Sequence, residues 1–134
     1  MDLNSALGLV YNNAKAASED SFLTFLLKCQ VSGEASFEML EKLNSELMEA
    51  LEIINNERRS NGFDCTELGL VQAITLILTH GWERYAWWTI HSQLPREFLV
   101  RLASILSDLG FAWARILDGS TPNLREALKE RREP

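Results

Sequence analysis

The segment LGLVQAITLILT, residues 68–79, decides the fold class of this chain. It has no charged residue, and its polar side chains Gln72, Thr75 and Thr79 recur at intervals of three or four positions. That interval matches the 3.6-residue turn of an α-helix and leaves only one narrow polar stripe on its surface. A helix with so little polar surface has to be covered on most sides. We therefore expect it at the centre of a helical protein.

A second segment of the same kind follows Pro95. Pro95 suits the first turn of a helix, and Gly119 can end it in the left-handed conformation, which gives a long helix from about 95 to 118. Gly110 inside it could permit close helix packing or a slight kink. Its polar side chains form one stripe, namely Glu97, Arg101, Ser104, Asp108 and Arg115.

Strand signals are almost absent from the rest of the chain, and periodicity predicts further helices over about 3–16, 19–31 and 34–59. Asp64 and Glu67 have the spacing of a capping box, so the first central helix should begin near them and pause at His80-Gly81. The sequence predicts a shorter helix in WERYAWWTIH, residues 82–91.

A last helix should begin at Thr121 and Pro122, with residues 129–134 frayed. Leu124, Ala127 and Leu128 are the side chains that would dock it. The expected fold is all-α: a compact single-domain helical bundle of five to seven helices over residues 1–134, with the helices near 65–79 and 95–118 central.

Composition indicates the cellular compartment and the class of partner that we expect. Cys29 and Cys65 lack CxxC spacing, which is typical of reduced thiols in a cytoplasmic protein. The first residues lack the basic start of a signal peptide, and the longest uncharged stretch falls short of the roughly 20 residues of a membrane span. The net charge of −6 disfavours direct nucleic-acid binding and favours a protein partner with a basic surface.

Two surfaces are candidates for contact with a partner. The first is an acidic arc on the helix expected at 34–59, which is either a solvated face or meets a basic partner. Its candidate contact residues are Glu38, Glu41, Glu49 and Glu52.

The second candidate surface is HGWERYAWWTIH, residues 80–91, because tryptophan and arginine are enriched among interface hot spots. Helical spacing places Trp82, Tyr85, Ala86 and Thr89 on one side, which we expect to face the core. The other side is mixed, with Trp88 at the border, and Trp87 is either an exposed anchor or covered by a neighbouring helix or by Arg84. The predicted contact residues are Arg84, Trp87, Trp88 and His91.

The sequence contains only weak motifs for catalysis or metal binding. Neither His80 nor His91 has the neighbours of a zinc site, no nucleophile motif occurs, and we predict no metal or cofactor. The chain is similar to all-helical nucleotide pyrophosphatases in size and in the Glu-x-x-Glu spacing of Glu46 and Glu49. The next acidic pair, Asp64 and Glu67, reverses the order that those enzymes use for magnesium.

We therefore predict a non-enzymatic protein-binding protein: an inhibitor, immunity-type factor, adaptor or small subunit of a larger complex. The alternative is a magnesium-dependent nucleotide pyrophosphatase that uses Glu46, Glu49 and Glu67. A homodimer formed through the helix at 34–59 or through the tryptophan face is also possible.

Overall fold

The computed structural model describes residues 1–15, 21–91, 94–119 and 123–132. These residues form helices joined by short connections, and no strand is assigned among them. The helices are α1 (Leu3–Asn13), α2 (Phe22–Ser32), α3 (Phe37–Asn61), α4 (Leu68–His91), α5 (Arg96–Asp118) and α6 (Leu124–Arg132).

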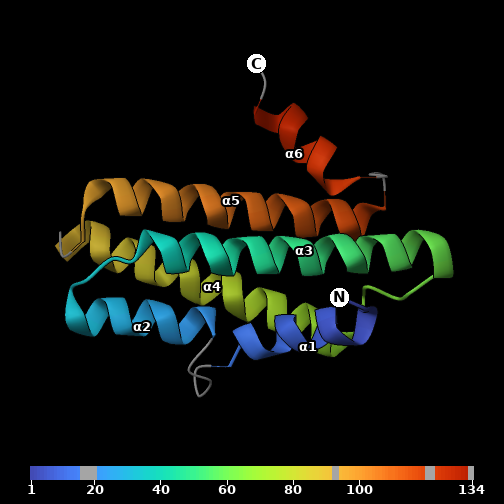
Figure 1. Ribbon diagram of the computed structural model, residues 1–134, viewed down its shortest axis with the longest axis horizontal. Coiled ribbons are helices and arrows are strands. Elements are labelled where there is room, and N and C mark those ends of the chain that lie inside the picture. Colours follow the sequence, from blue (N-terminus) through green and yellow to red (C-terminus); the bar gives the residue numbers. More distant parts are fainter. Residues whose placement is uncertain (16–20, 92–93, 120–122, 133–134) are drawn as a thin grey trace.

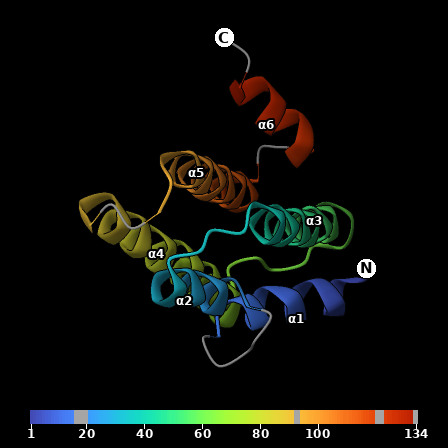
Figure 2. The same ribbon diagram turned by 60° about the vertical axis from the view of Figure 1, so that its left-hand side comes forward.

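The helices form a bundle whose long members are α3, α4 and α5 (Figure 1). Helix α4 contacts α1, α2 and α5, while α5 also contacts α3 and α6. Helices α1 and α2 follow one another along one side of the bundle, and α6 lies outside α5 at the opposite side (Figures 1 and 2). The predicted all-α bundle is confirmed, and α4 and α5 each contact at least three other helices. Helix α4 nevertheless leaves part of its surface uncovered, since Leu68, Leu76 and Ile90 are exposed.

Local signals mark several helix ends as predicted. Gly62 ends α3 and Gly119 ends α5, each with a positive φ, of 68° and 70° respectively. Glycine has no Cβ to oppose this left-handed conformation, which lets its N–H bond to carbonyls of the last turn. Pro95 precedes the first residue of α5, also as predicted.

The predicted pause at His80-Gly81 is wrong, because α4 runs without interruption from Leu68 to His91. Gly81 is buried inside the helix, and a Cβ placed there would lie 2.5 Å from Cδ2 of Leu106 in α5. This glycine therefore permits close contact between two helices instead of ending one. Gly110, for which we expected such a role, has no atom within 4 Å of its Cβ position.

The start of α4 also differs from the prediction. The side chain of Asp64 accepts a hydrogen bond from the backbone N–H of Thr66 at 2.9 Å and another from its hydroxyl. These bonds hold the pKa of Asp64 below its usual value. Asp64 thus stabilises a turn, and α4 begins only at Leu68.

Helix α6 docks through the predicted apolar side chains and through ion pairs to α5 and α3. Leu124, Ala127 and Leu128 are buried, and Arg131 contacts the buried carboxylate of Asp108 at 2.8 Å. Helix α6 continues to Arg132; residues 121 and 122, where we predicted its start, and 133 and 134 lie outside the described residues. The predicted fraying of residues 129–134 stays a prediction.

Within the described ranges, none of the helices combines the length and apolar character that crossing a membrane requires.

Candidate protein-binding surface on α2 and α4

The tryptophan-rich end of α4 presents a different set of residues from the one predicted. Trp88 is fully buried, so its assignment to a contact surface is corrected. Ile77, Gly81 and Trp88 are buried at intervals of four and seven residues, which is the period of one helix face. Because we predicted that the helix pauses at Gly81, we did not continue this period from Ile77 to Trp88.

The expectation that Trp82, Tyr85, Ala86 and Thr89 face the core is wrong as well. Trp82 is 38% exposed, Ala86 and Thr89 are exposed, and Tyr85 is half-buried. The Trp82 and Tyr85 rings meet edge to face, with centroids 5.5 Å apart. This side of α4 is therefore mostly a surface.

Three of the predicted contact residues do lie together on one side of α4. Arg84, Trp87 and His91 follow His80 at intervals of three or four residues, and the four side chains form what we call the α4 stripe. Trp87 is 44% exposed, and its ring contacts that of His91 with centroids 4.0 Å apart. Trp87 is thus an exposed aromatic side chain held by a neighbour on its own helix.

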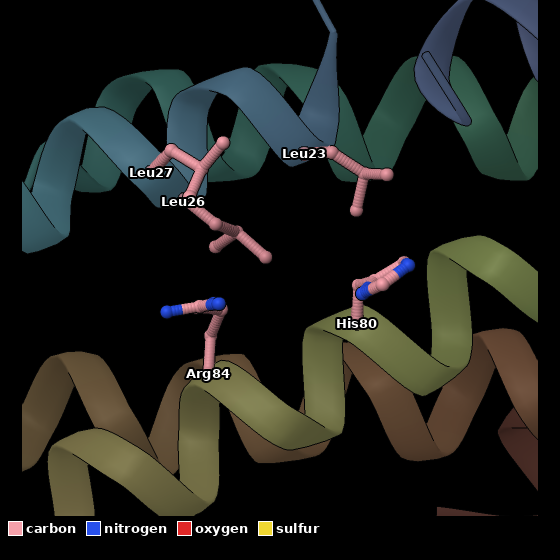
Figure 3. Close-up of a pocket in the computed structure, with 5 residues that line it drawn as sticks. All are labelled: Leu23, Leu26, Leu27, His80 and Arg84. Carbon is pink, nitrogen blue, oxygen red and sulfur yellow. The ribbon is translucent and has the colours of Figure 1, made fainter. Parts of the chain in front are cut away.

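The stripe borders a cavity of about 190 Å³ between α2 and α4, which we call the α2–α4 cavity. Leu23, Leu26 and Leu27 of α2 line it from one helix, and His80 and Arg84 of α4 line it from the other (Figure 3). Leu23 and Leu26 are buried, whereas Leu27 is 40% exposed. The apolar wall of the cavity therefore continues to the protein surface.

Arg84 connects the two helices at this cavity. Its guanidinium donates a hydrogen bond to the side-chain oxygen of Gln30 in α2. Nδ1 of His80 lies 3.3 Å from a carboxylate oxygen of Glu83, and these side chains are half-buried and exposed, respectively. The cavity thus has an apolar wall from α2 and a polar wall from α4 that includes the guanidinium of Arg84.

The acidic arc on α3 is only partly free, which corrects its prediction as one continuous contact surface. Glu41 accepts hydrogen bonds from Nε and, at 2.8 Å, from NH2 of Arg101 in α5. Glu52 pairs with Arg125 of α6 at 2.9 Å. Glu38 and Glu49 are exposed and stay candidates for contact with a basic surface.

A second groove lies on the other side of α4, against the start of α5. Its volume is about 470 Å³, and Trp88, Tyr85, Leu99 and Val100 are among its lining residues. The indole N–H of Trp88 is buried without a hydrogen-bond partner. The end of α4 is therefore flanked by hollows on two sides.

The described residues include two thiols and several carboxylates that could take part in chemistry. Burial raises the pKa of the Cys29 and Cys65 thiols, which disfavours the reactive thiolate. No group of three or more potential metal ligands is found among the described residues, and Glu46, Glu49 and Glu67 form none. The magnesium-dependent hydrolase stays an untested alternative.

Sequence reasoning missed the α2–α4 cavity. The sequence predicted a helix over about 19–31, but nothing in the spacing of its leucines identified α4 as its neighbour. His80 could have been added to the stripe, because it precedes Arg84 by one helical turn.

Comparison of the chain with protein-family models, curated proteins and solved structures gives no significant match.

Proposed function

We propose that this protein acts by binding another protein through the α4 stripe and the adjoining α2–α4 cavity. It would serve as an inhibitor, an immunity-type factor, an adaptor or a small subunit, without catalysis of its own. The observation that carries the proposal is the placement of Trp87, which is 44% exposed beside the half-buried Arg84 on one side of a helix.

Tryptophan and arginine support this proposal because both are enriched among the residues that dominate interface energies. The contact between Trp87 and His91 limits the freedom of the indole before binding. A side chain that is already ordered loses less conformational entropy when a partner covers it. The cavity beside Arg84 adds a recess into which a partner side chain can insert.

Affinity capture from an extract of the native cells tests the proposal. The variants are Trp87→Ala and, as a matched control, Trp82→Ala, which removes a 38% exposed tryptophan from a different side of α4. A third variant, Glu49→Lys, tests the exposed part of the acidic arc. All variants are checked for cooperative thermal unfolding before capture.

We expect the wild type and Trp82→Ala to retain a stoichiometric partner that Trp87→Ala loses. A partner lost only with Glu49→Lys would move the site to α3. Capture of the same proteins by all four forms, or of none above background, would contradict binding at this surface.

A further inference from the structure

The α2–α4 cavity is large enough for one side chain of a partner. Its volume is about 190 Å³, and an apolar cavity of about 150 Å³ can hold a benzene molecule. Three leucines supply the apolar contacts, and the exposure of Leu27 leaves a way in from the surface. An aliphatic side chain such as leucine, or a phenylalanine ring, matches this space.

Within the described ranges, the positive charge of Arg84 at the cavity has no ion-pair partner. Arg84 is half-buried, and its one hydrogen bond in the described structure goes to the neutral side chain of Gln30. By contrast, Arg101, Arg125 and Arg131 each pair with a carboxylate of another helix. Arg84 thus offers unused N–H donors and a positive charge next to an apolar recess.

The nearest acidic side chain on α4 does not fill this role. A carboxylate oxygen of Glu83 lies 3.3 Å from His80, and 58% of the Glu83 side chain is exposed. Among the described residues, no carboxylate forms an ion pair with Arg84. Arg84 is therefore the cationic group that a partner meets at the cavity.

From this arrangement we infer that the partner presents an amphipathic helix with an aspartate or glutamate one turn from a large apolar side chain. The apolar side chain enters the α2–α4 cavity, and the carboxylate accepts hydrogen bonds from Arg84. Residues one turn apart on a helix share a face, so one partner helix can place its apolar side chain in the cavity and its carboxylate beside Arg84, which lines the same cavity. This inference rests on the proposed function, because it names the chemistry of the partner at the same surface.

A display library of amphipathic helical peptides tests the inference without knowledge of the natural partner. The library is selected on the wild type and counter-selected on Trp87→Ala. Enriched peptides are then measured against Arg84→Gln and against the matched control Arg96→Gln, which neutralises an exposed arginine at the start of α5.

We expect enriched peptides to carry an acidic residue one turn from leucine, isoleucine, methionine or phenylalanine. Arg84→Gln should weaken their binding about tenfold, because a hydrogen bond to a charged group is lost. Arg96→Gln should leave it unchanged. Replacing the peptide carboxylate by its amide should give the same tenfold loss on the wild type, so the test holds even if Arg84→Gln does not fold.

The outcomes separate the two proposals. Two outcomes would overturn the proposed partner chemistry but not the proposed binding surface. In the first, the enriched peptides depend on Trp87 but lack the acidic residue. In the second, they bind Arg84→Gln with the same affinity as the wild type. A selection that enriches no peptide dependent on Trp87 would overturn both.

Discussion

Gly81 of α4 packs directly against the side chain of Leu106 in α5. A Cβ at residue 81 would come within 2.5 Å of one methyl carbon of Leu106, whose side chain is fully buried. Only a glycine lets the two helices approach this closely without a shift of Leu106. Gly81 directly follows His80, the first residue of the α4 stripe.

We predict that Gly81→Ala lowers the free energy of unfolding. Overpacking a core costs about 1–3 kcal/mol, which exceeds the gain of up to about 1 kcal/mol from replacing glycine inside a helix. Gly110→Ala is the matched control, because the space around its Cβ position is open. Urea unfolding should show stabilisation of up to about 1 kcal/mol for Gly110→Ala. Equal stabilisation by both substitutions would refute the close contact.

The glycines at the helix ends and inside α4 show which parts of the fold the sequence could predict. Gly62 and Gly119 were predicted correctly because a helix end is decided within its own last turn. The role of Gly81 depends on Leu106, which belongs to a helix much later in the chain, and no local pattern contains that information.

In the candidate site, too, some features could be predicted from local sequence and others could not. Continuing the period of Ile77 through the end of α4 would have identified Trp88 as a core residue, so that error was avoidable. The hydrogen bond between Arg84 and Gln30 was not predictable, since it requires α2 to lie beside α4. Apolar stripes on helices fit many neighbours, and only the folded arrangement selects one.

Trp87 and Trp88 should differ sharply in their effect on stability. Trp88→Ala should lower the free energy of unfolding by about 3–5 kcal/mol, because it leaves a cavity in the core. Trp87→Ala should lower it by about 1 kcal/mol or less, since that indole is 44% exposed. Urea unfolding followed by far-ultraviolet circular dichroism measures both without relying on tryptophan fluorescence. A comparable loss in the two variants would place Trp87 in the core and remove it from the binding surface.

Asn13 should be needed to hold α2 against α1. Its side-chain oxygen accepts a hydrogen bond of 2.8 Å from the backbone N–H of Phe22, and its amide donates to the carbonyl of Leu9 at 2.9 Å. Asn13 is only 2% exposed, so Asn13→Leu would leave the N–H of Phe22 without an acceptor in a buried position.

We expect Asn13→Leu to cost about 1–3 kcal/mol of unfolding free energy, the penalty for a buried unsatisfied group. The neighbouring Asn12→Leu is the control and should cost less. Amide hydrogen exchange adds a local readout, in which the first turn of α2 should lose protection in the Asn13 variant. Unchanged exchange there would show that other contacts hold this end of α2.

The ion pair between Glu41 and Arg101 should make stability depend on pH in a defined direction. Hydrogen bonds from Arg101 lower the pKa of Glu41 from its ordinary value of 4.5. Because the folded pKa is the lower one, the folded state binds fewer protons than the unfolded state between the two values. The pair therefore stabilises the fold above the unfolded pKa, and its contribution is lost as pH falls through the folded pKa.

Glu41→Gln should accordingly lower the unfolding free energy by about 1 kcal/mol or less at pH 7, a small effect because both side chains are partly exposed. The difference from the wild type should shrink as pH falls below about 4, where the unfolded carboxyl binds a proton before the folded one does, and it should vanish below the folded pKa. Glu49→Gln, at an exposed position on the same helix, is the control and should change stability little at either pH. A difference between Glu41→Gln and the wild type that stays constant from pH 7 to pH 3 would show that the pair does not supply this stability.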